Sequence, residues 1–397
     1  MDDKAHIHHT LPHEAPNKAE MAEILKAYQS VALVFQGGGA LGAYQAGVFE
    51  ALSEVGIAPD WLSGVSIGAI NAAIITGNKP GQQLDRLRSF WELVSQQSNW
   101  RIPPELDIFR AISNQTSAFV TMTSGIPGFF KPRSSNAFAN PFAFLMPTQD
   151  SASYYDTSEL RDTLNRFIDW DILNNQERRL SVGAVNVHTG NFRYFDTALE
   201  RIGPEHIMAS GALPPAFPAI KIENEYYWDG GIVSNTPLQY LLELEQLTDT
   251  LVFEVDLFSA RGKIPVTMAD VAARQKDIMY SSRTRNNTDS FKRMHNLRVS
   301  LRDALLRVPE NQRSPEDQQF LSSMSNVPQI NIIHLIYQQK GYENDAKDYE
   351  FSRVSMLDHW KSGLEDTRKT IRHRQWLKAP PESTGLSIHD VHRDDPN

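Results

Sequence analysis

The chain has 397 residues, which is enough for one large domain or two moderate ones with a sizeable core. Its formal net charge of −9, from 39 Lys and Arg against 48 Asp and Glu, argues against a dedicated nucleic-acid-binding protein. The absence of cysteine excludes disulfides, thiolate metal sites and cysteine nucleophiles, and it is compatible with a reducing compartment. No stretch approaches the roughly 20 apolar residues of a membrane-spanning helix, so we expect a soluble, cytoplasmic protein with peripheral membrane contact at most.

Residues 1–28 contain acids and histidines but no apolar core that could act as a secretion signal. We predict a disordered tail here. No second cluster of ligands accompanies the histidines, so metal binding is the weaker interpretation. These histidines are His6, His8, His9 and His13.

The next stretch predicts a buried strand, a glycine loop and a helix in direct succession. Val31–Phe35 is an uninterrupted apolar run of strand length, and Gly37, Gly38 and Gly39 follow it at once. From Ala40 onward, apolar residues recur at three- and four-residue spacing, which is typical of a helix that starts on the loop. The amino terminus of that helix directs backbone amides and a partial positive charge at the loop.

A serine turn comes one helix later. Gly64-Val65-Ser66-Ile67-Gly68 follows a short strand and precedes a helix of small residues that ends at Gly77. This is the pattern of a nucleophile on a tight strand-to-helix turn, where side chains two residues to either side would clash. The pattern makes Ser66 the candidate nucleophile.

The glycine loop also fits Gly-x-Gly-x-x-Gly, the fingerprint of a dinucleotide site, through Gly37, Gly39 and Gly42. Asp60 lies at about the spacing of a ribose-binding acid. Such an acid belongs at the carboxyl end of the second strand, however, whereas Asp60 precedes that strand and Ser66 follows it. A dinucleotide site and a simple packing turn are therefore the weaker interpretations.

Residues 99–155 form a segment interrupted by prolines and rich in phenylalanine. It is too aromatic for a solvated linker and too interrupted for long helices. We interpret it either as a cap that lines an acyl pocket or as an irregular insertion packed on the core. Its phenylalanines include Phe119, Phe129, Phe130, Phe138, Phe142 and Phe144.

Farther along, the pattern predicts a helix from Ser158, a hairpin over 180–195, a short helix over 206–210 and a second hairpin over 220–228. The second hairpin leads directly into Asp229-Gly230-Gly231. Taken alone, an aspartate before two glycines is an ordinary turn residue. Another apolar strand is predicted at Leu251–Leu257.

Together, the glycine loop, the serine turn and the Asp-Gly-Gly motif make the chain resemble the patatin-like phospholipase family. Its members pair a Gly-Gly-Gly-x-x-Gly oxyanion loop with a Gly-x-Ser-x-Gly turn about one helix later, and an Asp-Gly-Gly or Asp-Gly-Ala motif closes the site. All three motifs occur here in this order, and the resemblance covers about residues 31–257. One departure is Leu41, where many relatives carry Arg or Lys.

The resemblance implies a three-layer α/β fold with a mostly parallel central sheet. It also implies a serine lipid acyl hydrolase of phospholipase A type that needs no cofactor or metal, with phospholipid or another acyl-ester lipid as substrate. Ser66 would be the nucleophile and Asp229 the base of a catalytic dyad, which should be partly desolvated because an ordinary carboxylate is a weak base. The oxyanion hole would consist of the amides of Gly37, Gly38 and Gly39, and the motif glycines are Gly42, Gly64, Gly68, Gly230 and Gly231.

Other interpretations stay open. A soluble-ester carboxylesterase or a thioesterase would use the same residues, an acyl transferase would usually present His where this chain has Val65, and a non-catalytic lipid-binding module would need no reactive serine. An ordinary serine hydrolase would add a histidine after the acid. We interpret His334, which lies inside an apolar run, as a core residue. The histidine candidates are His295, His334, His359, His373, His389 and His392, none in a convincing loop motif.

We expect residues 29–260 to form the hydrolase domain, with the cap insertion near 99–155. Residues 261–397 should form a basic, mainly helical extension with one added strand near 330–337, a long helix over 354–371 and a disordered tail after Pro380. Residues 261–313 carry 12 Lys and Arg against 5 Asp and Glu. A basic face could attract the protein to anionic phospholipid, but solvation or pairing with the acidic body explains the charges equally well. The sequence does not predict an oligomeric state.

Overall fold

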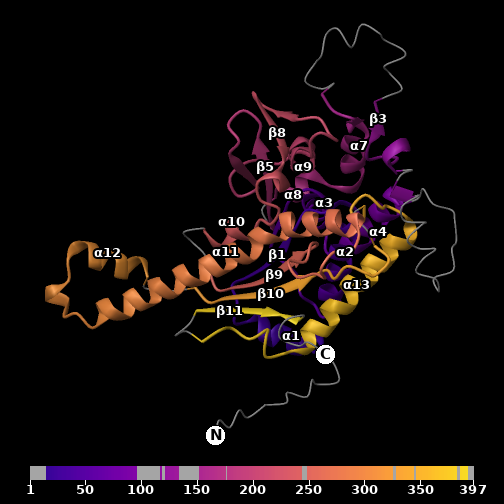
Figure 1. Cartoon of the computed structure of the whole chain (residues 1–397). Coiled ribbons are helices and arrows are strands. Elements are labelled where there is room, and N and C mark those ends of the chain that lie inside the picture. The colour runs from indigo at the N-terminus through magenta and orange to yellow at the C-terminus, as the bar shows by residue number, and fades with distance from the viewer. Residues whose placement is uncertain are drawn as a thin grey trace.

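The computed structural model describes residues 15–95, 117–118, 121–133, 152–175, 177–243, 248–324, 328–343, 346–381 and 385–391, without the side chains of 282–287. Its centre is a nine-stranded sheet in the order β11-β10-β9-β1-β2-β5-β8-β7, with β6 paired to β5 (Figure 1). The strands are β1 (Ser30–Phe35), β2 (Trp61–Gly64), β5 (Arg179–Asn186), β6 (Phe192–Asp196), β7 (Ile220–Ile222), β8 (Glu225–Asp229), β9 (Thr250–Asp256), β10 (Ile330–Ile336) and β11 (Leu386–Asp390).

The sheet is mostly parallel, as predicted. The run from β11 to β5 is parallel throughout, whereas β6, β7 and β8 pair in the antiparallel sense. The predicted hairpins correspond to β5–β6 and β7–β8. A separate two-stranded sheet joins β3 (Lys131–Pro132) to β4 (Tyr155–Asp156).

Helices cover both faces of the sheet, which gives the three layers that the sequence predicts. Leu33 and Phe35 point to one face and Ala32 and Val34 to the other, so the apolar run of β1 is buried on both sides. One face packs against α2 (Ala43–Glu54), α3 (Ile67–Thr76), α4 (Gln83–Val94) and α13 (Arg353–Arg372), and the other against α10 (Leu238–Leu242) and α11 (Met268–Leu306).

Helix α1 (Lys18–Leu25) corrects the prediction that residues 1–28 are a disordered tail. Asn17 and Glu20 form a capping box at its start, and Met21 is fully buried. Side-chain caps at the amino terminus satisfy backbone N–H groups that would otherwise lack partners, which stabilises so short a helix. The other short elements are η1 (Gly39–Gly42), α7 (Ser158–Phe167), α8 (Trp170–Leu173), α9 (Pro204–Ser210), η4 (Gly230–Ile232), η5 (Glu310–Gln312) and α12 (Pro315–Ser323).

The C-terminal region is mainly helical, as predicted, and it adds two strands to the central sheet. Strand β10 pairs with β9, and β11 pairs with β10 within the tail predicted to be disordered, where Leu386 lies in register with Ile330. The prediction of one added strand and a disordered tail after Pro380 is therefore wrong over 386–390. The long helix predicted over 354–371 is present as α13.

Helix α11 begins at a capping box formed by Thr267 and Asp270 and runs for 39 residues. Its inner half covers the sheet, while its outer half and α12 project away from the body (Figure 1). Much of the predicted cap, including Phe119, Phe138, Phe142 and Phe144, lies outside the described residues. Among the helices that the structure describes, none is both long and apolar enough to cross a bilayer.

Candidate active site

The serine turn has the backbone strain expected of a nucleophile elbow. Ser66 links β2 to α3 with φ of 57° and ψ of −126°, a conformation that residues other than glycine rarely adopt. A Cβ atom on Gly64 would lie 2.4 Å from backbone atoms of Gly68, and one on Gly68 would lie 2.5 Å from the carbonyl oxygen of Phe35. The two motif glycines therefore permit the tight turn that presents the Ser66 side chain at the carboxyl edge of the sheet.

Ser210, at the end of α9, supports this turn. The Ser66 N–H group donates to the carbonyl oxygen and to Oγ of Ser210, both at 3.1 Å. The Ser210 hydroxyl donates in turn to the carbonyl oxygen of Gly183 on β5, at 2.7 Å. Ser210 was not among the residues predicted for the site.

Within the glycine loop, the N–H group of Gly37 differs from those of Gly38 and Gly39. It donates to the carbonyl oxygen of Asn235 at 3.3 Å, and Asn235 Nδ2 donates back to the Gly37 carbonyl oxygen at 3.0 Å. The N–H groups of Gly38 and Gly39 have no hydrogen-bond partner in the described part of the chain, and both residues line the same cavity as Ser66. The predicted oxyanion hole therefore needs a correction, because the Gly37 amide is already engaged.

Buried amide side chains hold this loop from behind. Gln45 Nε2 donates to the carbonyl oxygen of Gln36 at 2.6 Å, and Asn71 Nδ2 donates to Gln45 Oε1 at 2.8 Å and to the Gly42 carbonyl oxygen at 2.9 Å. The indole N–H group of Trp91 donates to Asn71 Oδ1 at 3.0 Å. Buried polar groups that are mutually satisfied in this way fix one arrangement of the backbone around them.

Asp229 ends β8 and is 2% exposed. Burial raises the pKa of its carboxyl group to about 7, although the N–H group of Gly231, at 2.7 Å, and the hydroxyl group of Ser66 both lower it. Gly230 packs against Gly183 and continues with Gly231 into the 3₁₀ turn η4. The structure thus brings the side chains of Ser66 and Asp229 together, beside two backbone amides that have no partner among the described residues.

An apolar cavity opens in front of these groups. The aromatic segment contributes Phe129 and Phe130, which belong to the described part of the predicted cap. The C-terminal region contributes further side chains that the sequence analysis did not assign to the site. The cavity is lined by Ile67, Ile70, Phe129, Phe130, Leu160, Met208, Leu213, Phe217, Phe258, Tyr280, Asp348, Tyr349 and Phe351, besides the motif residues.

No histidine lines this cavity among the described residues, so they offer no third member of a Ser-acid-His triad. His334 lies inside β10, with Nδ1 2.9 Å from Glu254 and 4.0 Å from Asp256. Burial alone would lower the pKa of His334, but the two carboxylates outweigh it and raise the pKa to about 9. His334 is therefore a core residue in an ion pair, and His392 lies outside the described residues.

Glu254, Asp256 and His334 are also the only group of three or more potential metal ligands that the described residues contain within 4.8 Å of one another. A protonated imidazole offers no lone pair to a metal ion, and neutral His is the form that ligates. The raised pKa of His334 therefore favours the ion pair. The group lies within β9 and β10 and does not line the cavity.

Asp60 lies at the amino end of β1 and β2, where it accepts hydrogen bonds from the Ser30 hydroxyl group and, at 3.1 Å, from the N–H group of Val31. The glycine loop follows the carboxyl end of β1. An acid at the opposite edge of the sheet cannot reach a ribose bound at that loop. The geometry therefore excludes Asp60 as the acid of a dinucleotide site.

Comparison with known sequences agrees with this geometry. A sequence profile described as "Patatin-like phospholipase" matches residues 33–242, which is more than half of the chain. The chain belongs to the patatin-like phospholipase family. A second profile, described as "Patatin phospholipase", matches residues 278–383. The first match contains Ser66 and Asp229, and the second contains the C-terminal residues Asp348, Tyr349 and Phe351 that line the cavity.

The patatin-like chain is similar at low identity to one curated protein and to two solved structures. The patatin-like phospholipase domain-containing protein 7 of Rattus norvegicus is 26% identical over 219 residues, which is 55% of this chain but only 13% of that protein. The solved structure of VipD from Legionella pneumophila has 16% identity and a TM-score of 0.39, over 92% of this chain and 73% of VipD. The type III effector protein ExoU has 12% identity and a TM-score of 0.28, over 88% of this chain and 53% of ExoU.

Proposed function

We propose that this patatin-like protein hydrolyses acyl ester bonds of phospholipid or a related lipid, through an acyl-serine intermediate on Ser66 with Asp229 as the base. One observation carries the proposal. A strained serine and a buried carboxyl group with a pKa of about 7 share one apolar cavity with two backbone amides that no described residue engages.

In the first step, the Ser66 hydroxyl group attacks the ester carbonyl carbon while the Asp229 carboxylate takes its proton. A pKa of about 7 suits a base that works near neutral pH, since about half of the groups are ionised there. The negative charge that develops on the carbonyl oxygen is stabilised by the N–H groups of Gly38 and Gly39. Each well-placed donor of this kind contributes roughly 3–4 kcal/mol.

The tetrahedral intermediate then collapses. The bond to the leaving oxygen breaks, and protonated Asp229 gives that oxygen its proton, which releases a lysophospholipid or another alcohol. In the second half-reaction, Asp229 takes a proton from water as the water attacks the acyl-serine. The fatty acid leaves and the proton returns to Ser66.

The lining of the cavity supports an acyl chain as the bound group. Ile67, Ile70, Leu160, Met208 and Phe217 surround the space next to Ser66, and burial of methylene groups there contributes about 0.8 kcal/mol for each group. Soluble esters, thioesters and acyl transfer would use the same reacting groups. A panel of dispersed lipids and soluble esters, with products identified by mass spectrometry, ranks these substrates.

The projecting half of α11 supports peripheral contact with an anionic lipid surface. Met294, Leu297 and Leu301 recur at three- and four-residue spacing and are 56%, 63% and 46% exposed, so they form one apolar stripe that faces solvent. Arg293 and Arg298 are exposed at its two edges. An exposed apolar stripe flanked by cations is complementary to the interface of an anionic bilayer. We call these three apolar residues the α11 stripe.

The predicted basic face is smaller than the sequence suggested. Arg274 donates to the carbonyl oxygens of Ser259 and Ala260, and Lys276 pairs with Asp348, so both are committed within the body. The side chains of Arg283 and Arg285 lie outside the described part of the chain. Peripheral contact would therefore depend on the outer half of the helix, and a cytoplasmic location stays a prediction.

Ser66→Ala tests the proposed reaction. It should abolish hydrolysis of phospholipid vesicles and leave the melting temperature close to that of the wild type, because the substitution removes only the hydroxyl group. Ser63→Ala, on the strand β2 that leads into the serine turn, is the matched control and should keep activity. Wild-type turnover by Ser66→Ala would contradict the proposal.

A further inference from the structure

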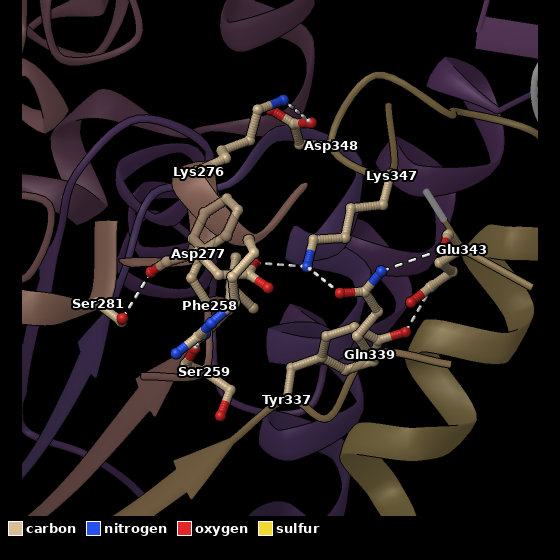
Figure 2. A network of polar contacts seen from close by, with 12 residues as sticks. Phe258, Ser259, Lys276, Asp277, Ser281, Tyr337, Gln339, Glu343, Lys347 and Asp348 are labelled. Atoms are coloured by element: carbon tan, nitrogen blue, oxygen red, sulfur yellow. Dashed lines mark hydrogen bonds and ion pairs between the residues drawn. The ribbon is translucent and has the colours of Figure 1, made fainter. Parts of the chain in front are cut away.

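The loop after β10 and the inner half of α11 are joined by two ion pairs with crossed charges (Figure 2). Lys276 and Asp277 are neighbours on α11, and Lys347 and Asp348 are neighbours on the loop. Lys276 Nζ lies 2.7 Å from Asp348 Oδ1, and Lys347 Nζ lies 2.7 Å from Asp277 Oδ1. Each element contributes one cation and one anion, so a shift of the loop along the helix would separate both pairs.

The pair of Lys347 and Asp277 is hidden from water. Lys347 is 4% exposed and Asp277 is 6% exposed. The ammonium group of Lys347 also donates to Gln339 Oε1 at 3.2 Å, and it lies 5.5 Å from the centre of the Phe258 ring (Figure 2). Leaving one charge of such a pair buried alone is strongly unfavourable, so the pair fixes the position of residue 347.

The next residue carries this position into the active site. The carbonyl oxygen of Asp348 accepts a hydrogen bond from the N–H group of Ala40 at 2.9 Å. Gly39 has φ of 54°, and a Cβ atom on it would lie 2.2 Å from the same oxygen. The Asp348 carbonyl group therefore lies directly against the segment whose amides, at Gly38 and Gly39, are assigned to the oxyanion.

Helix α11 also reaches the start of the glycine loop. Gln36 Nε2 donates to the carbonyl oxygen of Tyr280 on α11 at 3.1 Å, and Gln36 Oε1 accepts from the N–H groups of Leu257 and Phe258. The glycine loop is thus held by α11 at one end and by the loop that α11 fixes at the other.

We propose that Lys347 and Asp277 are positioning residues for the oxyanion loop. Their ion pair holds the Asp348 carbonyl group against the Ala40 amide and so keeps the Gly38 and Gly39 amides directed at the developing oxyanion. Neither residue lines the catalytic cavity, so both act through the loop. The inference rests on the proposed function of Ser66 and deepens it, because it makes the C-terminal region part of the catalytic apparatus.

Lys347→Met tests this role, with kcat and KM measured on p-nitrophenyl butyrate, a soluble ester. We expect kcat to fall about 10- to 100-fold, up to the loss that follows removal of one oxyanion donor, while KM changes less than about threefold. The charge swap combines Lys347→Asp with Asp277→Lys. Its kcat should be at least tenfold higher than that of the less active of the two single variants, Lys347→Asp and Asp277→Lys. A folded Lys347→Met protein with kcat within threefold of wild type would overturn the proposal, and so would a folded charge swap without recovery.

A second variant keeps the test decisive if Lys347→Met does not fold. Lys347→Met combined with Asp277→Leu leaves no unpaired buried charge, and it is judged by the same loss of kcat. The control is the ion pair of Arg179 and Asp196, 2.7 Å apart at the amino end of β5 with Asp196 fully buried. Asp196→Asn should lower the melting temperature and leave kcat within threefold of wild type.

Hydrogen exchange gives a readout that does not depend on hydrolysis. The Ala40 amide should exchange at least tenfold faster in Lys347→Met than in wild type, and it should be unchanged in Asp196→Asn. Equal protection of Ala40 in wild type and Lys347→Met would overturn the positioning role. An active Ser66→Ala protein would instead defeat the proposed reaction, so the two failures are distinguishable.

Discussion

Two buried aspartates, Asp229 and Asp277, differ in whether a cation lies beside the carboxyl group among the described residues. Asp229, in the patatin-matched region, has no cationic partner among the described residues, and burial raises the pKa of its carboxyl group to about 7. Asp277, on α11, is similarly hidden but lies 2.7 Å from the ammonium group of Lys347. A buried carboxylate without a cation is a base near neutral pH, whereas one paired with lysine holds two elements together.

The largest effect should follow from removing the unpaired carboxylate. Asp229→Asn leaves the cavity nearly unchanged in shape but removes the base, so we expect hydrolysis of vesicle phospholipid to fall on the order of 10³-fold or more. Asp60→Asn, at the opposite edge of the sheet, is the matched control. Activity of Asp229→Asn within tenfold of wild type would remove Asp229 from the mechanism.

Removing the cation from the paired aspartate should act on stability as well as on turnover. Lys347→Met leaves Asp277 buried and unpaired, and we expect the free energy of unfolding to fall by about 3–5 kcal/mol at pH 8. Urea denaturation measures this loss. A Lys347→Met protein whose free energy of unfolding lies within about 1 kcal/mol of wild type would contradict the assignment of Asp277 as a buried charge left without a partner.

Replacing Asp229 with a neutral residue should raise the free energy of unfolding, whereas Lys347→Met should lower it. The pKa of Asp229 in the folded state, about 7, exceeds the ordinary value of 3.8, so the folded state holds its proton more tightly than the unfolded state. Wild-type stability therefore falls as pH rises from about 4 to about 7, and Asp229→Asn is free of this loss. We expect the variant to be more stable than wild type by about 2–4 kcal/mol at pH 8, with a smaller difference at pH 5. Equal stability of wild type and Asp229→Asn at each of the two pH values would show that Asp229 is not desolvated.

The smallest effect should come from the exposed charges and apolar groups of the outer half of α11. Leu297→Asp interrupts the α11 stripe, so hydrolysis of anionic vesicles should fall about three- to tenfold relative to a soluble ester. Cosedimentation with vesicles should fall in parallel, and added salt should weaken wild-type binding. If Leu297→Asp instead abolishes a dimer in light scattering and leaves vesicle binding intact, the stripe is a contact between copies of the chain.

The arrangement of the proposed reacting groups could be predicted from the sequence because its signals are local. Strand β1, the strained turn at Ser66 and the hairpin that ends at Asp229 each depend on a few adjacent residues, and the family motifs placed them in one site. Local pattern did not reveal that the Gly37 amide is engaged by Asn235, because these residues are almost 200 positions apart. The pairing of Lys347 with Asp277 has the same character, since a charged residue shows no preference for one distant partner in the sequence.

The wrong predictions at the two ends of the chain, for α1 and β11, have a different cause. Helix α1 and strand β11 are too short for periodicity to separate them from disordered sequence, and tertiary contacts stabilise both. Met21 is buried in the main core, and β11 continues the ladder that starts at β10. Asn17, as a capping residue, is the feature of the sequence that could have predicted α1.

The central claim is that Asp229 activates Ser66, and the rate at which a fluorophosphonate labels Ser66 tests it most directly. The account predicts that labelling of the wild type rises with pH along a single ionisation near 7. Asp229→Asn should label at least 100-fold more slowly at pH 8 and without that ionisation. Labelling of Asp229→Asn at the wild-type rate, with the same dependence on pH, would contradict the account.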